Sequence, residues 1–304
     1  MSRILVTGAT GFVGQGLVAR LTADGRPFLA PDRKSIGDIG PDTDWTTALD
    51  GMDAVVHLAG RAHIFKAEAD PLITFRKVNT AGTARLAEQA ARAGVRRFLL
   101  VSSVKAAVDV SGLNAVTEAD APSPRTPYGV SKLEGEQALR AAAGKMETVV
   151  LRPPLVYGPG VRANFLALLK LVDRGIPLPL GSVRNLRSLI ARDNLVDAIL
   201  TAIDAPGAGG GTFYVTDGKP LSTPDLIRRL ARALGRSATL LPFPPVLLRM
   251  PAALLGRAES ADSLLGSLVV DDAAFRAATG WQPPVTAAQA FADVAAWYGK
   301  TKNA

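Results

Sequence analysis

The amino-acid sequence predicts an α/β protein with a doubly wound parallel sheet. Three observations predict this fold. Short apolar runs alternate with helical patterns through the first half, a glycine-rich turn follows the first run, and 304 residues suffice for one large or two small domains. Parallel strands buried on both faces form unbroken apolar runs, and the helices between them make right-handed crossovers.

The expected strands are short and apolar: Ile4–Thr7, Phe28–Ala30, Ala54–Ala59, Phe98–Ser102 and Thr148–Arg152. The clearest helical patterns between them are Leu17–Ala23, Phe75–Ala93 and Tyr128–Ala143. Strands that alternate with helices in this way build a Rossmann-type sheet.

Proline and glycine become frequent after Arg152, and a smaller domain is predicted from this change. We expect a dinucleotide-binding domain over residues 1–154 with a return segment at about 188–204. Residues 155–187 and 205–304, with a strand at Thr212–Thr216, are expected to form a mixed α/β substrate-binding domain.

Composition excludes several kinds of chemistry. The chain has no cysteine and two histidines, so disulfides, thiolate nucleophiles and histidine-rich metal sites are not expected. Its net charge of +8 fits an anionic ligand, but no basic stripe with interleaved aromatic residues indicates nucleic-acid binding. Without a signal peptide or an unbroken apolar span, a cytoplasmic protein with no integral membrane segment is expected.

The first turn has the pattern of a dinucleotide site. Residues 7–14, Thr-Gly-Ala-Thr-Gly-Phe-Val-Gly, follow a predicted strand and open a helix. Gly8 permits the tight turn, Gly11 lets the backbone approach a pyrophosphate, and Gly14 lets helix and strand pack closely. We therefore expect residues of this turn to bind NAD or NADP: Gly8, Thr10, Gly11, Phe12, Val13 and Gly14.

The choice between NAD and NADP is left open by the end of the second strand. Asp32 would accept hydrogen bonds from the adenosine ribose and favour NAD. The adjacent Arg33 and Lys34 would instead hold a 2′-phosphate, or form an ordinary solvated loop.

Tyr128 and Lys132 have the spacing of an acid/base pair on one helix. Residues at i and i+4 share a helix face, so the ammonium would lower the pKa of the phenol. With Ser103 upstream, this arrangement predicts hydride chemistry on a carbinol.

Taken together, the chain resembles the extended short-chain dehydrogenase/reductase family nearly end to end. The motifs that carry the resemblance stand in the family's order: residues 7–14, Gly37–Ile39 after an expected third strand, His57–Gly60, Val78-Asn79 with Gly82-Thr83, Val101–Ser103, Tyr128–Lys132, Arg152–Gly160 and Asp193–Ala198. The resemblance implies Ser103, Tyr128 and Lys132 as catalytic residues. It also implies cofactor contacts at Asp38, Ile39, Leu58, Ala59, Gly60, Asn79 and Pro153, with Lys132 on the nicotinamide ribose.

The resemblance further implies a UDP-sugar substrate and is compatible with a homodimer. Asn164 and Phe165 would meet the diphosphate at a helix N-terminus, Pro179 lies in the segment that clasps the base, and Arg187 would pair with phosphate. Lys105 would reach the substrate rim, or remain a solvated lysine.

Two departures narrow the expected reaction. Family dehydratases carry an Asp-Glu pair where this chain has Val104 and Lys105, so 4,6-dehydration is not expected. Many epimerases carry Asn where this chain has Leu155, which puts a standard galactose epimerase in doubt. A narrower branch that the chain resembles reduces UDP-4-keto-6-deoxy-hexosamines for bacterial polysaccharides, and its members are often labelled UDP-glucose 4-epimerases.

The sequence therefore predicts an NAD(P)-dependent reductase of the C4 ketone of a UDP-4-keto-6-deoxy-N-acetylhexosamine. Two rival hypotheses remain. A UDP-sugar 4-epimerase would use the same residues in both directions, and a non-catalytic NADP-binding regulator would use the fold alone.

Overall fold

A six-stranded parallel sheet forms the larger lobe of the computed structural model, which describes residues 2–62, 70–248 and 264–302. The strand order is β2-β1-β3-β4-β5-β8. The strand bounds are β1 Ile4–Thr7, β2 Phe28–Leu29, β3 Ala54–His57, β4 Arg97–Val101, β5 Glu147–Arg152 and β8 Thr212–Tyr214. The predicted doubly wound α/β fold is confirmed.

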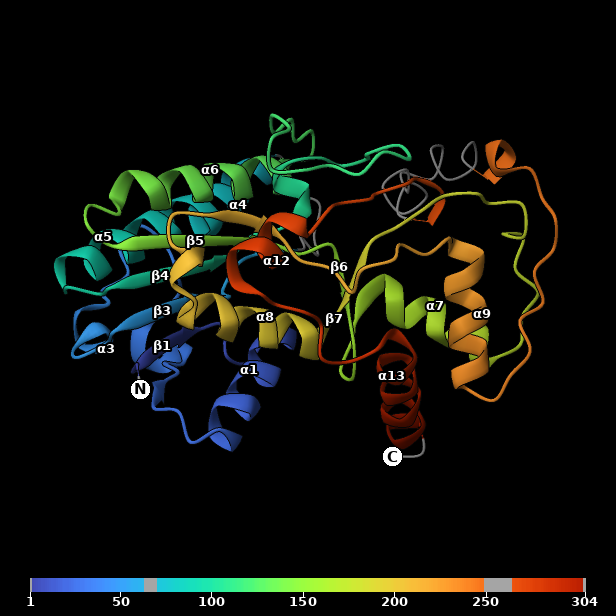
Figure 1. Cartoon of the computed structure of the whole chain (residues 1–304), viewed down its shortest axis with the longest axis horizontal. Coiled ribbons are helices and arrows are strands. Elements are labelled where there is room, and N and C mark those ends of the chain that lie inside the picture. Colours follow the sequence, from blue (N-terminus) through green and yellow to red (C-terminus); the bar gives the residue numbers. More distant parts are fainter. Residues whose placement is uncertain (1, 63–69, 249–263, 303–304) are drawn as a thin grey trace.

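Helices cover both faces of this sheet (Figure 1). One face carries α4 (Pro71–Phe75), a π-helix (Arg76–Gly82), α5 (Thr83–Arg92) and α6 (Pro127–Ala142); the other carries α1 (Phe12–Ala23), α8 (Arg192–Asp204) and α12 (Ala273–Thr279). Two short helices, α2 (Arg33–Ile36) and α3 (Thr46–Leu49), follow β2. Successive side chains of β1 point to opposite faces of the sheet. Ile4 and Val6 pack in the cluster with α1 and α8, whereas Leu5 packs in the cluster with α5.

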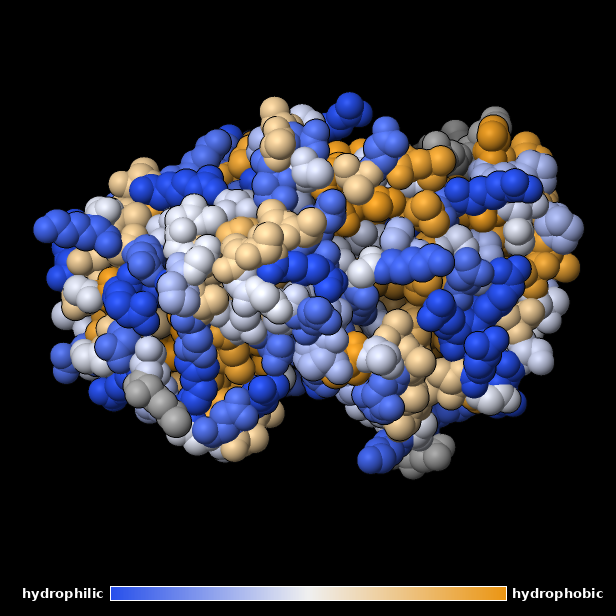
Figure 2. Space-filling view, viewed as in Figure 1, coloured by the Kyte–Doolittle hydropathy of each residue, from blue (hydrophilic) through white to orange (hydrophobic). Residues whose placement is uncertain are grey.

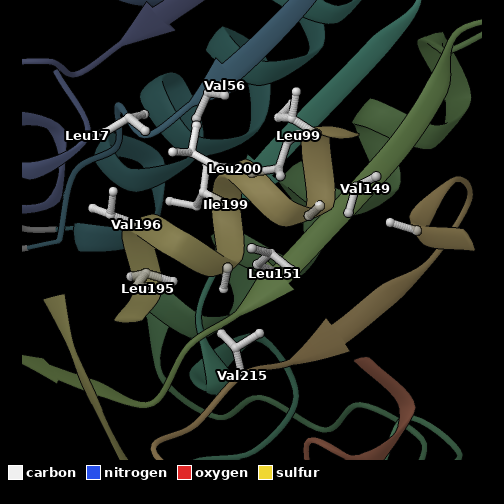
Figure 3. Packing of buried hydrophobic residues seen from close by; sticks show 14 of the residues in the cluster. Leu17, Val56, Leu99, Val149, Leu151, Leu195, Val196, Ile199, Leu200 and Val215 are labelled. Carbon is white, nitrogen blue, oxygen red and sulfur yellow. The ribbon is translucent and has the colours of Figure 1, made fainter. Parts of the chain in front are cut away.

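The apolar core between the sheet and α8 fixes the larger lobe (Figure 3). Leu195, Ile199 and Leu200 of α8 belong to one buried cluster with Leu99 of β4 and Leu151 of β5. Through this packing α8, which lies in the expected return segment, covers one face of the sheet.

In the part of the smaller lobe that the structure describes, helices pack beside a two-stranded parallel sheet. These elements are β6 (Leu155–Tyr157), β7 (Leu189–Ala191), α7 (Ala163–Asp173), α9 (Thr223–Ala233) and α13 (Ala287–Lys302). Tyr157 stacks on Phe165 at 5.7 Å and on Phe291 at 4.9 Å between ring centroids. Figure 2 shows hydrophobic side chains gathered along the upper edge of the molecule. The exposed large apolar residues include Leu241, Phe243, Val246 and Leu247.

Two expectations from the sequence are corrected. Thr212–Tyr214 was expected in the smaller domain, but it is β8 of the large sheet, because its backbone pairs with Val150–Arg152 of β5. No strand precedes Gly37–Ile39 after β2 among the described residues, since Asp32 caps the short helix α2 there. None of the helices that the structure describes is long and apolar enough to cross a membrane.

Candidate functional site

The turn between β1 and α1 has the geometry that a dinucleotide requires. Gly8 has φ +72°, and a Cβ there would lie 2.7 Å from the Ala59 nitrogen. A Cβ on Gly14 would lie 2.2 Å from the Gly8 carbonyl oxygen, so glycine is needed at both positions. No side chain caps α1 at Gly11, which leaves the first-turn amides for an anion. The turn therefore fits the pyrophosphate of NAD or NADP.

A buried polar network joins this turn to the end of β3. His57 Nδ1 lies 2.6 Å from Thr7 Oγ1, His57 Nε2 lies 3.1 Å from Thr83 Oγ1, and Thr83 Oγ1 donates to the Asn79 carbonyl at 2.8 Å. The hydroxyl proton of Thr83 is donated to the Asn79 carbonyl, so Thr83 Oγ1 can only accept from the histidine. His57 Nε2–H therefore donates to Thr83 Oγ1, and Nδ1 accepts a hydrogen bond from the Thr7 hydroxyl. Burial, and secondarily the charge of Lys132, lowers the pKa of His57 to about 3, so the imidazole is neutral near neutral pH.

Asn79 ties the loop after β3 to α6. Its side-chain oxygen accepts from Arg61 N at 2.8 Å, and its amide nitrogen donates to the Arg61 carbonyl at 2.9 Å and to Ser131 Oγ at 3.0 Å. The π-helix Arg76–Gly82 carries this side chain, and such distortions are frequent at functional sites. The amide of Asn79 also orients the Gly60 loop, where a Cβ would lie 3.2 Å from Asn79 Oδ1. The expected contact between Asn79 and the cofactor stays a prediction.

The start of α6 positions Tyr128. Thr126 caps the helix by accepting from Gly129 N at 3.2 Å, and Pro127 occupies the first turn. A Cβ on Gly129 would lie 2.3 Å from the Lys105 carbonyl oxygen, so α6 packs directly on the turn that Ser103 begins. As a result, Tyr128 and Ser103 form a side-chain hydrogen bond, and the Tyr128 ring packs edge-on against Phe75 at 5.8 Å.

The electrostatics of Tyr128 differ from the sequence expectation. Burial raises the pKa of the phenol, and the hydrogen bond with Ser103 offsets part of that rise. Lys132 was expected to lower this pKa, but its ammonium donates to the Val101 carbonyl at 3.0 Å. Burial lowers the pKa of Lys132 itself to about 8, against the opposing effect of Glu136. The structure thus brings the three predicted catalytic residues together, with Lys132 held at the end of β4.

A buried ion pair beneath α6 was missed by the sequence reasoning. Glu136 is fully buried and accepts from Arg152 at 2.6 and 3.1 Å, while Ser102 Oγ donates to it at 2.5 Å. The guanidinium of Arg152 also lies 5.8 Å from the Tyr214 ring centroid. The available sequence signal was the position of Glu136 one turn after Lys132, on the same helix face.

The predicted adenosine end contains a surface ion pair. Arg33 Nε lies 2.8 Å from Asp38 Oδ1, and both side chains are exposed. Asp32 Oδ1 accepts from Lys34 N at 3.1 Å and Ser35 N at 3.0 Å, so this carboxylate caps α2. Ile39 packs beside Gly82: a Cβ added to Gly82 would lie 2.8 Å from the Ile39 Cγ2 methyl group. These contacts leave the NAD or NADP choice open.

Most of the expected substrate residues lie in the smaller lobe, and Lys105 lies in the larger one. Asn164 is exposed at the start of α7, whereas the side chain of Phe165 is buried in the core of the smaller lobe. Pro179 lies in a segment held against residues 239–241, because Leu178 N donates to the Thr239 carbonyl at 2.9 Å. Arg187 is mostly buried and donates to the Gly266 carbonyl at 3.0 Å. Lys105 is partly buried on the turn after β4.

Several remaining cofactor candidates have structural contacts. Val13 and Leu58 pack against the main core, Pro153 is buried with its carbonyl accepting from Val104 N at 3.0 Å, and Thr10 is exposed at the turn. Phe12 packs against the core of the smaller lobe. No cluster of three metal-ligating side chains occurs among residues 2–62, 70–248 and 264–302.

Comparisons with known proteins agree with this geometry. A model of the NAD dependent epimerase/dehydratase family matches residues 4–215. UDP-glucose 4-epimerase from Vibrio cholerae is 41% identical over 99% of this chain and 96% of its own. GDP-6-deoxy-D-mannose reductase from Pseudomonas aeruginosa is 30% identical over 94% of each chain. The solved structure of UDP-N-acetylglucosamine 4-epimerase from Bacillus cereus superposes with a TM-score of 0.80 at 22% identity, covering 97% of this chain and 99% of that one.

Proposed function

The chain belongs to the NAD dependent epimerase/dehydratase family, and from that premise we propose that it acts on C4 of a UDP-linked hexose. The proposed direction is reduction of the C4 ketone of a UDP-4-keto-6-deoxy-N-acetylhexosamine, for bacterial polysaccharide synthesis. The observation that carries the C4 chemistry is the contact between Ser103 and Tyr128, at the same edge of the parallel sheet as the glycine turn.

The residues divide the work of the reaction. Bound NADH or NADPH would supply the hydride for C4. The phenol of Tyr128 donates the proton to the developing alkoxide, while the hydroxyl of Ser103 donates a hydrogen bond to the same oxygen. Phe75 packs edge-on against the ring of Tyr128 and helps to hold it in place. The ammonium of Lys132, fixed by Val101, supplies positive charge beside the reacting groups.

The absence of a carboxylate pair after Ser103 supports a substrate that is already oxidised at C4 and deoxygenated at C6. Val104 is buried in a small apolar cluster, and Lys105 is a cation, so neither side chain can move protons in the way a dehydratase requires. Elimination of water would therefore precede this enzyme.

A 4-epimerase is the second candidate, and the Vibrio cholerae relative favours it. Tyr128 would accept the proton during oxidation at C4 and return it during reduction. Between the two steps the 4-keto sugar would rotate in its pocket, so that hydride returns to the other face. Leu155, the position that weakened this alternative in the sequence, is exposed at the start of β6.

One assay separates these functions. Purified protein is given UDP-4-keto-6-deoxy-GlcNAc with NADH or NADPH, and in parallel UDP-glucose or UDP-galactose without added reductant. Stoichiometric consumption of reduced cofactor only with the keto sugar supports the reductase. Interconversion of UDP-glucose and UDP-galactose without net consumption supports the epimerase, and no turnover of any of these sugars contradicts the C4 assignment.

A further inference from the structure

Arg192 bridges the two lobes at the cofactor turn. Its guanidinium donates to the Pro159 carbonyl at 2.7 Å, and its Cζ lies 5.8 Å from the centroid of the Phe12 ring. Phe12 is the first residue of α1, within the turn that fits the pyrophosphate. Pro159 belongs to the loop of residues 158–163, which runs from β6 to the start of α7. One side chain therefore contacts an element of the cofactor site and an element of the proposed substrate site.

The local structure shows that this bridge is closely packed. A Cβ on Gly158 would lie 2.9 Å from the Cβ of Arg192, and a Cβ on Gly16 would lie 3.0 Å from its Nε. Glycine at both positions is what lets the arginine lie between α1 and the loop. The aromatic ring of Phe12 itself packs into the core of the smaller lobe.

The position of Arg192 conflicts with ordinary helix preferences. It is the first residue of α8, where the positive end of the helix dipole disfavours a cation. Asp193 pairs with it at 2.9 Å and offsets part of that cost. A residue that breaks a local rule while making long-range contacts is a candidate for a functional role.

The 158–163 loop has little freedom of its own. Gly158 has φ +155°, Gly160 has φ +90°, and Ala163 has φ +53°, which is unusual for alanine. The loop ends where Asn164 opens α7, the expected diphosphate contact. A shift of Pro159 would therefore be transmitted to the start of α7 through a constrained backbone.

We propose that Arg192 is a positioning residue that couples the cofactor turn to the 158–163 loop, so that NAD(P) and a UDP group strengthen each other's binding. This inference rests on the proposed function. A cofactor in the turn favours one position of Phe12, and Arg192 transmits that position to Pro159 and so to the start of α7, where the diphosphate is expected. Each ligand therefore favours the same arrangement of the bridge, and the two affinities are coupled.

The test is calorimetric titration with UDP, alone and with saturating NAD or NADP. For the wild-type protein we expect the cofactor to tighten UDP binding about five- to fiftyfold. In Arg192→Leu this ratio should fall toward one, whereas Arg228→Leu, which removes an exposed arginine of α9, should keep it. A role of Arg192 in stability alone would lower Tm and leave the ratio unchanged.

The possible results distinguish failure of the proposed coupling through Arg192 from failure of the proposed function. A wild-type ratio near one, or an Arg192→Leu ratio equal to that of the wild type, overturns the coupling while the C4 chemistry stands. Failure of the wild type to bind UDP under any condition overturns both. Should Arg192→Leu not fold, Phe12→Leu removes the other side of the contact, and an unchanged ratio there is equally decisive.

Discussion

Glu136 and Arg152 form a buried ion pair one helical turn beyond Lys132, with oxygen–nitrogen distances of 2.6 and 3.1 Å. Glu136 lies on α6 and Arg152 ends β5, so the pair fixes the helix that carries Tyr128 and Lys132 to the sheet. Buried charges of this kind carry a large desolvation cost, and each partner depends on the other.

Breaking this pair should be strongly destabilising. Glu136→Gln leaves the Arg152 guanidinium without its counter-charge, and we expect the free energy of unfolding in urea to fall by about 3–5 kcal/mol. The double variant Glu136→Met with Arg152→Met should lose less than the sum of the single variants, because neither charge remains. A single-variant loss below about 1 kcal/mol, typical of surface pairs, would contradict this.

Tyr128→Phe should abolish turnover while leaving cofactor binding nearly intact. The hydroxyl moves the proton, whereas the ring keeps its packing against Phe75. We expect kcat to fall by on the order of 10²–10⁴. Tyr298→Phe, which removes a hydroxyl from α13, is the matched control and should keep full activity. Near-full turnover of correctly folded Tyr128→Phe would remove Tyr128 from the proposed acid role.

The pH profile should report the charge of Lys132. Because burial lowers the pKa of Lys132 to about 8, the ammonium is present below that pH and is lost as the pH rises through it. We expect kcat/KM to decline above about pH 8 for this reason. Lys132→Arg, measured by the same profile, should not decline there, because a guanidinium keeps its proton. A wild-type profile that stays flat to about pH 10 would argue against a role for the ammonium.

Asp32 is the position at which to test cofactor choice. Removal of the carboxylate in Asp32→Ala should weaken NAD more than NADP, because the charge accepts ribose hydroxyls or repels a 2′-phosphate. The alanine also removes the cap of α2, so Asp32→Asn is the better variant, since its amide oxygen can still accept from Lys34 N and Ser35 N. Fluorescence titration with both cofactors gives the two affinities. Equal changes for NAD and NADP would show that Asp32 does not discriminate.

The sequence by itself determined the features that depend on local spacing. Strand Ile4–Thr7, the glycine turn and the helix over Tyr128–Ala143 followed from an apolar run, glycine positions and a helical pattern, all of which act over a few residues. The spacing of Tyr128 and Lys132, with Ser103 upstream, indicated hydride chemistry, and the structure brings Ser103 and Tyr128 together.

Tertiary structure alone decided which distant groups meet. Thr7 and His57 are fifty positions apart, Arg152 and Glu136 sixteen, and Arg192 and Pro159 thirty-three, so no helical or strand period relates them. It also decided that β8 joins the large sheet and that the Lys132 ammonium donates to Val101. Contacts between residues far apart in the sequence, and the desolvation of a buried charge, depend on how the whole molecule packs. Local sequence patterns do not encode them.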